Sequence, residues 1–387
     1  MTGKRVFIAA VLIASSFFLY GFLAYVYEIF PYDQLVNAKR LITPQELCKW
    51  NPSDYPLVFE TDVQSLIKIR SEDDVIKKRE ALVDLIWNEN GFPSLKLPDL
   101  VENNINDSRY SDLKNLQRID KISIIMDYEV NSIAYLFLAE KSNENLVIYH
   151  QGHKGDFSNG KDAIQFFLEQ GYSVLALTMP LKGMNNQPIV DLPNHGLIKL
   201  AAHNQFFLLD SPQFSSIKFF VEPIAVSLNY LDKMFKFKSY NMVGLSGGGL
   251  TTVLYSAIDD RISQSYSVAG MYPSYIGQMF LLHDVNYSIW FTSAHYESVV
   301  SRLYNTANTI ELYVMSAYGE ERKAVHVFNK YDPGTRCGEF YKTYEDSVKL
   351  KISQLGEGTF DTYLDDTHKE HIISDHALTV ILKHMTT

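Results

Sequence analysis

Short apolar runs alternate with amphipathic stretches from about residue 118 to the end of the chain. The first two runs, 122–126 and 133–138, flank Asp127–Asn131, a combination that predicts two strands joined as a hairpin. Further runs follow, and the apolar ones among them are typical of strands that are buried on both faces. These further strand candidates lie at 146–149, 172–177, 242–243, 263–268, 324–328 and 359–364.

Amphipathic segments between these runs predict helices. Several carry end signals, such as Ser71 before three acidic residues, Gly171 after a helical segment and Ser374 ahead of another. The predicted helices lie at 71–86, 161–170, 217–235, from Leu250 onward, at 339–354 and at 374–385. A strand, a helix and a second strand at this spacing form a right-handed crossover between parallel strands. The pattern therefore predicts an α/β fold with a mostly parallel central sheet flanked by helices.

Other segments lack a core periodicity. Residues 31–70 are predicted to be a connector, and 180–213 to help shape a pocket. The stretch 270–322 is rich in Tyr, Met and Phe, and we expect an insertion that covers the functional site. The predicted organisation is an N-terminal segment (1–30), a helical extension (31–117) and a main domain (118–387) that contains the insertion.

The N-terminal segment has a long uncharged run. Lys4 and Arg5 precede it, it extends from Val6 to Tyr27, and Glu28 ends it. About 22 helical residues at 1.5 Å each reach across a hydrocarbon core of roughly 30 Å. The run predicts an uncleaved signal anchor, a single transmembrane helix that leaves the main domain outside the cytoplasm, in the periplasm if the source is bacterial. The alternatives are a cleaved signal peptide, which would give a secreted protein, and a buried core helix.

Composition narrows the function classes. Across 387 residues, 46% hydrophobic and 13% aromatic content suffice for a large core, and the net charge of −10 argues against nucleic-acid binding. Cys48 and Cys337 do not form a C-x-x-C motif, which excludes a zinc ribbon or a thioredoxin-like site. Whether these two cysteines pair stays open, and so does the oligomeric state.

The main chemical motif is G-x-S-x-G, formed by Gly244, Ser246 and Gly248 between a strand candidate and a helix candidate. A nucleophile on a tight strand-to-helix turn adopts strained backbone angles, and small residues on either side keep the turn free of clashes. The turn exposes the hydroxyl and places the next backbone N–H near a developing oxyanion. The alternative is an ordinary loop, because glycine and serine are common.

A hairpin, then alternating strands and helices, and a serine turn in mid-chain together resemble the α/β-hydrolase fold over about residues 118–385. The resemblance implies a triad in the chain order Ser, acid, His. Asp332 follows the strand candidate 324–328, and His371 lies between the last strand and the last helix. Asp332 in Asp-Pro-Gly could instead form a turn. His368 is the alternative base, and His376 also competes.

The resemblance also assigns roles. His371 would take the proton of Ser246, and Asp332 would orient the imidazole. Gly247 would supply one oxyanion N–H, and the second would come from the loop after strand 146–149. That loop reads His150-Gln151-Gly152-His153, with Gln151 as an extra residue relative to the family pattern. We expect His153 as the second donor, with Gly152 as the next candidate.

A cluster of Asp365, Asp366, His368 and His371 raises the alternative of a metal site, but no second cluster or helical His-x-x-x-His pair accompanies it. No metal and no cofactor are expected. The predicted function is that of a serine esterase, possibly a deacetylase, acting on a small-molecule or glycan ester. An oligopeptidase-type peptidase and a non-catalytic binding protein on the same fold are the alternatives. The expected partners are the ester substrate and, through the N-terminal helix, a membrane.

Overall fold

The computed structural model describes residues 13, 15–21, 56–193, 195–270, 272–273, 275–276, 301–332 and 338–386. The chain divides into two compact units, Met1–Glu46 and Leu47–Thr387. In the first unit the described residues are helical and exposed. The fold described below is that of the second unit.

The prediction of a membrane anchor is wrong for the part of the chain that the structure describes. No helix there is long and apolar enough to cross a membrane. Within the uncharged run, residues 13 and 15–21 are described, and the rest of the run lies outside the described residues. The prediction of a single-pass membrane protein with its main domain outside the cytoplasm is therefore wrong for the described residues.

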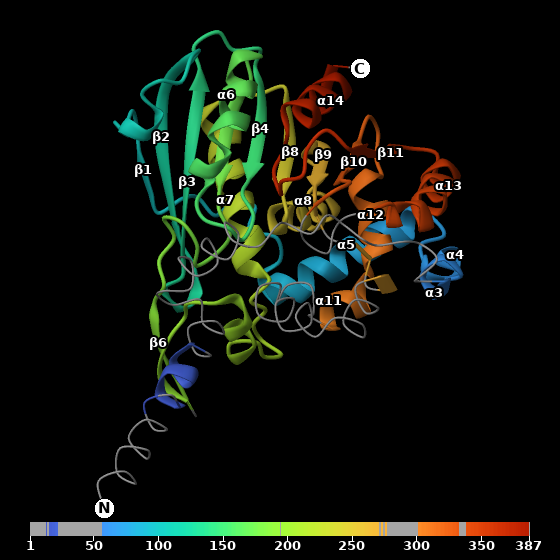
Figure 1. Cartoon of the computed structure of the whole chain (residues 1–387), viewed down its shortest axis with the longest axis horizontal. Coiled ribbons are helices and arrows are strands. Elements are labelled where there is room, and N and C mark those ends of the chain that lie inside the picture. Colours follow the sequence, from blue (N-terminus) through green and yellow to red (C-terminus); the bar gives the residue numbers. More distant parts are fainter. Residues whose placement is uncertain are drawn as a thin grey trace, which may run out of the picture. The chain divides into compact units, whose positions relative to one another are not determined.

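The second unit is built on a central sheet (Figure 1). Its strand order is β1-β2-β3-β5-β4-β8-β9-β10-β11, and all neighbours from β5 to β11 are parallel, whereas β1, β2 and β3 pair antiparallel. The strands are β1 Leu100–Glu102, β2 Leu116–Ile125, β3 Asn131–Ala139, β4 Asn145–His150, β5 Ser173–Leu177, β8 Ser239–Leu245, β9 Ile262–Val268, β10 Lys323–Asn329 and β11 Thr359–Asp365. The predicted hairpin and mostly parallel α/β sheet are confirmed.

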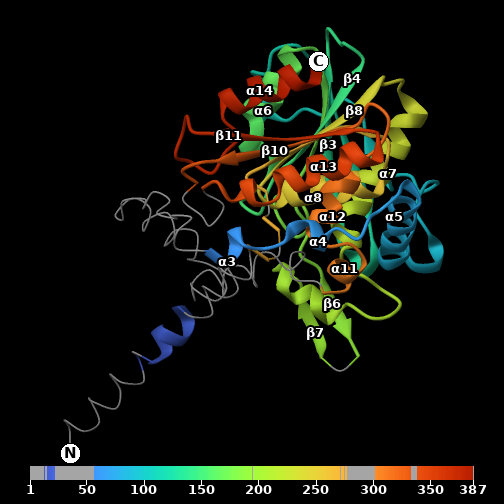
Figure 2. The same cartoon turned by 90° about the vertical axis from the view of Figure 1, so that its right-hand side faces the viewer.

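Helices cover both faces of this sheet (Figure 2). The core on one face includes α6 (Lys161–Glu169) and α14 (Asp375–Thr386). The core on the other face includes α5 Glu72–Trp87, α7 Lys218–Met234, α8 Gly247–Ile258, α12 Thr309–Ala317 and α13 Glu345–Leu355. Shorter helices are α3 Pro56–Phe59, α4 Val63–Leu66 and α11 Ser301–Thr306, with 3₁₀ turns at Asn88–Asn90, Ser108–Tyr110, Asp127–Glu129, Phe157–Gly160, His203–Leu208 and Phe340–Thr343. Coverage on both faces explains why every residue of β5 is buried and why its sequence shows no alternation.

From Leu47 onward, the N-terminal extension belongs to the second unit. The predicted boundary at 118 falls inside β2, and β1 from the extension pairs with that strand. Buried carboxylates fasten the extension further: Trp87 Nε1 donates to Glu222 at 2.8 Å, and the backbone N–H of Lys68 donates to Glu311 at 2.8 Å. Helix α5 begins as predicted, with Ser71 and Asp74 forming a capping box.

The predicted insertion 270–322 is described only in part, so its extent stays a prediction. Its last part contains α12, whose nine residues are all buried and which belongs to the same core as α8. Helix α12 therefore lies in the connection between the parallel strands β9 and β10. Residues 277–300 lie outside the described part of the chain. The segment 180–213, for which no strand was predicted, contains an antiparallel hairpin of β6 (Ile189–Leu192) and β7 (Gly196–Lys199).

Candidate active site

Strand β8 leads directly into helix α8, both labelled in Figure 1. Ser246 lies between the last residue of β8 and the first residue of α8. Its backbone angles are φ 59° and ψ −121°, which are strained for a residue with a side chain. The strain is held by the sheet and the helix, because the Ser246 N–H donates to the Val268 carbonyl at 2.9 Å and its own carbonyl accepts from Leu250 N at 3.2 Å. This is the geometry of the predicted nucleophile turn.

The glycines on either side of Ser246 are required by close backbone contacts. A Cβ at Gly244 would lie 2.1 Å from the carbonyl oxygen of Gly248. A Cβ at Gly248 would lie 2.1 Å from the carbonyl oxygen of His150. Neither backbone oxygen can move aside without breaking the sheet or the helix, so G-x-S-x-G is a packing requirement at this turn.

The loop after β4 passes directly over the turn. A Cβ at Gly152 would lie 2.7 Å from the Cβ of Ser246 and 3.4 Å from the N atom of Gly247. A Cβ at Gly247 would lie 2.3 Å from Nδ1 of His153, so the imidazole of His153 rests against Gly247. The structure thus brings the three residues predicted for the oxyanion site together around Ser246.

The residue that departs from the family pattern, Gln151, is buried and hydrogen-bonded within the loop. Its side chain accepts from the Tyr149 hydroxyl and donates to the Lys154 carbonyl at 3.2 Å. Its backbone N–H donates to the Leu177 carbonyl at 2.9 Å. Gln151 therefore ties the loop to β4 and β5. Next to it, burial lowers the pKa of His150 to about 4, so this imidazole is neutral at pH 7.

Asp332 and His371 form a pair. His371 Nδ1 lies 2.5 Å from Oδ2 of Asp332, and the Asp332 side chain is 1% exposed. Because a carboxylate only accepts, Nδ1 carries the proton and Nε2 is left as the acceptor in the neutral ring. Both residues follow the carboxyl ends of the adjacent parallel strands β10 and β11, and Ser246 follows the carboxyl end of β8. All three therefore lie at the same edge of the sheet.

The competing histidines have other partners. His368 Nε2 lies 3.4 Å from Oδ2 of Asp365, and its Nδ1 accepts from Glu370 N at 3.2 Å. His376 Nε2 lies 2.5 Å from the hydroxyl of Tyr363. Of the described histidines, His371 is the one for which a contact with Asp332 is observed.

Residues that would suggest a metal site do not converge. In the described ranges no group of three or more His, Cys, Asp or Glu side chains is placed to hold a metal ion. Asp365 instead accepts hydrogen bonds from Thr367 and Ser374. Cys48 and Cys337 lie outside the described residues, so their predicted alternatives, pairing or separate burial, stay open.

His203 is a neighbour of the site that the sequence did not indicate. Its ring centroid lies 5.1 Å from that of His153, and its Nε2–H donates to the Pro180 carbonyl at 2.7 Å. His203 is nearly fully buried and belongs to the segment 180–213. That segment has no periodicity, so no pattern pointed to this histidine.

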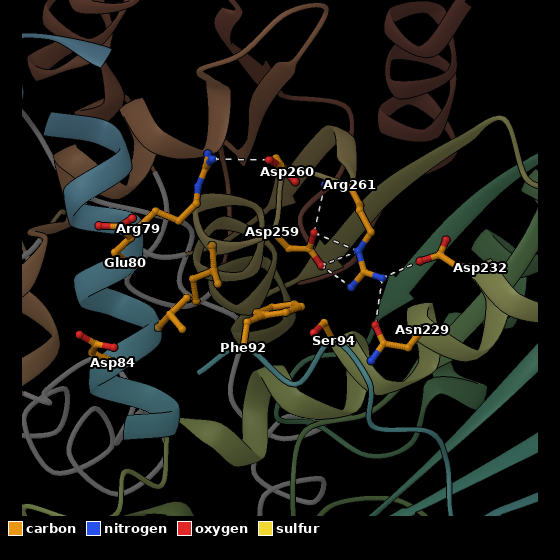
Figure 3. A pocket seen from close by; sticks show the side chains of 12 residues that line it. Arg79, Glu80, Asp84, Phe92, Ser94, Asn229, Asp232, Asp259, Asp260 and Arg261 are labelled. Carbon is orange, nitrogen blue, oxygen red and sulfur yellow. Dashed lines mark hydrogen bonds and ion pairs between the residues drawn. The ribbon is translucent and has the colours of Figure 1, made fainter. Parts of the chain in front are cut away.

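A pocket of about 640 Å³ lies at the other end of α8, lined by Arg79, Glu80, Val83, Asp84, Phe92, Ser94, Asn229, Asp232 and residues 258–261. Figure 3 shows the Arg261 side chain bridging Asp259, Asp232 and Asn229. The twelve residues of α8 span about 18 Å, which separates this pocket from Ser246 at the first turn. The pocket therefore lies apart from Ser246 and is not the predicted site of Ser246, Asp332 and His371.

No family model matches the sequence, and no curated protein matches it. Solved structures do match. An acetyl xylan esterase from Thermoanaerobacterium sp. shares 11% identity, with 86% of this chain and 97% of that one covered and a TM-score of 0.54. An acetyl xylan esterase from Paenibacillus sp. R4 shares 12% identity (84% and 98% covered, TM-score 0.52). An esterase of Pyrococcus furiosus shares 13% identity (76% and 98% covered, TM-score 0.50).

Proposed function

We propose, from the α/β-hydrolase fold of this chain, that it is a serine esterase with Ser246, His371 and Asp332 as its catalytic triad. The observation that carries the proposal is the hydrogen bond of His371 Nδ1 to Asp332, at the sheet edge where Ser246 occupies its strained turn. With Nδ1 protonated, Nε2 of His371 is the atom that can take a proton from a serine hydroxyl. Ligand sites of open α/β sheets lie at this edge.

The reaction follows from these roles. A neutral serine is a poor nucleophile, so Nε2 of His371 removes the hydroxyl proton as Oγ of Ser246 attacks the ester carbonyl carbon. The tetrahedral intermediate collapses, the bond to the alcohol oxygen breaks, and the alcohol leaves with the proton from His371. Water then attacks the acyl-enzyme by the same route and releases the acid. Asp332 stabilises the imidazolium that forms in each half.

The oxyanion of the intermediate needs donors that are already in place. The backbone N–H of Gly247 is the first, because it follows the nucleophile at the start of α8. We assign the second to the loop of Gly152 and His153, whose contact with Ser246 and Gly247 supports the assignment. In acyl-transfer enzymes, removing one such donor costs about 10²–10³ in kcat.

A carboxylic ester of a small molecule or a glycan is the substrate class that fits best. Two of the solved structures with this fold are acetyl xylan esterases, and a third is an esterase. Their names support a short acyl group, such as acetyl, on a carbohydrate. The proposed reaction is then deacetylation, which releases acetate and the sugar hydroxyl.

The direct test is labelling of the full chain by a fluorophosphonate, which reacts with activated serines. The wild-type protein should be labelled and Ser246→Ala should not. Ser239→Ala is a matched control on the same strand, where the hydroxyl donates to Asn145, and it should be labelled like the wild type. Absence of labelling on the folded wild type would contradict the proposal. Hydrolysis of 4-nitrophenyl acetate and acetylated xylan oligosaccharides, compared with peptide amides, then separates esterase from peptidase activity.

A further inference from the structure

The loop that carries His371 is fastened at both of its ends to one carboxylate. The loop connects β11 to α14, and Asp365 is the last residue of β11. Oδ1 of Asp365 accepts from the backbone N–H of Thr367 at 3.0 Å and from its hydroxyl at 2.6 Å. Oδ2 accepts from the hydroxyl of Ser374, at the far end of the loop. A single side chain therefore sets the distance between the two ends.

The same carboxylate lies near His368, whose Nε2 is 3.4 Å from Oδ2. Asp365 is fully buried. Burial alone would raise its pKa, but the hydrogen bonds from Ser374 and Thr367 outweigh burial and lower the pKa of Asp365. The group is consequently ionised at neutral pH and acts only as an acceptor, which suits the donors arranged around it.

A second tie joins this loop to the strand that leads to Asp332. Asn329 is the register partner of Asp365 at the ends of β10 and β11, and its Nδ2 donates to the Ile372 carbonyl at 2.9 Å. Lys330 N donates to the backbone carbonyl of Asp365 at 2.8 Å. The loops of Asp332 and His371 thus start from one pair of strand ends, and small movements of Asp365 would shift one loop against the other.

We propose that Asp365 is a positioning residue for the proposed ester hydrolysis, which it serves by holding the loop 366–374 so that His371 meets Asp332. The inference rests on the proposed function. Asp365 touches neither Ser246 nor the reacting atoms, so it acts through His371. The rival role is purely structural, because Ser374 also caps α14 by accepting from Ala377 N at 2.9 Å.

The test compares steady-state kinetics of full-length variants. Asp365→Asn keeps the shape of the side chain but replaces one acceptor by a donor that faces Ser374. We expect kcat for an acetyl ester to fall about 10²-fold with KM changed less than about twofold, because a misplaced base slows the chemical step and leaves binding intact. Wild-type kcat in folded Asp365→Asn would overturn the proposal.

A second series works even where Asp365→Asn does not fold. Ser374→Ala removes one end of the tie and the cap of α14, whereas Ser374→Thr keeps a hydroxyl for both. Ser71→Ala removes the corresponding cap of α5 and is the matched control. We expect kcat to fall about tenfold in Ser374→Ala, to recover in Ser374→Thr and to stay at the wild-type value in Ser71→Ala.

Equal kcat in Ser374→Ala and Ser71→Ala, at similar losses of stability, would show that the contacts are structural and would overturn the proposal. Fluorophosphonate labelling separates this failure from that of the proposed function. If the wild type is labelled at Ser246 but the variants keep wild-type kcat, only the role of Asp365 is lost. If the folded wild type is not labelled, the proposed function itself fails.

Discussion

Helix α8 begins beside Ser246 and ends beside the pocket of Figure 3, and its two ends are built from different interactions. At its start the contacts are between backbones: Gly248 meets the carbonyl oxygen of His150, and Gly152 meets Ser246. At its other end the contacts are between charges. The Arg261 guanidinium is shared by Asp259 at 2.7 Å and Asp232 at 2.7 Å.

The difference shows which kind of order chemistry requires. Around Ser246 the chain leaves no room for a Cβ at several positions, so the backbone there is closely packed, which suits the narrow geometric tolerance of a reacting centre. Around Arg261 the cation already has carboxylate partners, and it also lies 5.7 Å from the centroid of the Phe92 ring. Those charges hold helices together. The charged residues that line this pocket are therefore a poor guide to the candidate site in this molecule.

The largest effect should come from the acid of the proposed triad. Asp332→Asn keeps the shape of the side chain but favours the wrong tautomer of His371, so kcat should fall by about 10⁴-fold. Steady-state hydrolysis of an acetyl ester measures it. The control is Asp259→Asn, another buried aspartate at the far end of α8, which should keep kcat within about twofold. Similar losses in both variants would remove the distinction between the two ends.

The next largest effect should come from placing a methyl group at Gly248, where the backbone lies against the carbonyl oxygen of His150. In Gly248→Ala the new methyl group would meet the carbonyl oxygens of His150 and Gln151 at 2.1 and 2.9 Å. We expect a loss of about 3 kcal/mol in the free energy of unfolding and at least about 10²-fold in kcat, because the turn and the oxyanion loop must separate. Denaturant unfolding and ester hydrolysis measure the two effects.

Gly196→Ala is the control for this substitution. Gly196 has φ +68° and open space around its Cα, so an alanine there carries backbone strain without a clash. It should cost about 1–2 kcal/mol and leave kcat unchanged. If Gly248→Ala behaves like Gly196→Ala, the close contact at the start of α8 does not matter for the site.

The sequence predicts those parts of the fold and the site that depend on residues close together in the chain. Buried parallel strands are short apolar runs, and the glycines around Ser246 are needed because their Cα atoms touch backbone oxygens. The sequence alone favours His371 over His368 as the partner of Asp332 but does not decide between them. The two histidines are three residues apart, and the path of the loop between them depends on Asp365, whose role appears only when β10 and β11 are in register.

Other parts of the fold had no such signal. Helix α12 is buried around its whole circumference, so its sequence lacks the single apolar stripe that marks an amphipathic helix, and the Tyr, Met and Phe content of 270–322 favours an insertion instead. The hairpin of β6 and β7 exposes Ile189 and Leu197, which breaks the usual alternation of inward apolar and outward polar residues. Tertiary contacts determine both elements.

A smaller effect is expected on the free energy of unfolding when the pH is lowered. Burial lowers the pKa of His150 to about 4, from an ordinary value of 6.5. Between these values the unfolded chain binds a proton at His150 that the folded chain does not, so the free energy of unfolding falls as the pH drops from 7 towards 4. His150 alone accounts for about 2 kcal/mol at pH 5. Urea unfolding at pH 7 and pH 5 should show this loss, reduced in His150→Gln and unchanged in the exposed control His195→Gln.

The smallest effect on catalysis should come from substituting Arg261, near the end of α8 that lies away from Ser246. Arg261→Gln removes the cation from Asp259 and Asp232, but the Tyr255 hydroxyl still donates to Asp259 at 2.5 Å. The free energy of unfolding should fall by about 1 kcal/mol, since the guanidinium is partly exposed and its ion pairs are screened by solvent. Because α8 lies between Arg261 and Ser246, kcat and KM should stay within about twofold of the wild type. A tenfold loss of kcat in a variant that remains folded at the assay temperature would mean that the two ends of α8 are coupled, and that the pocket contributes to the reaction.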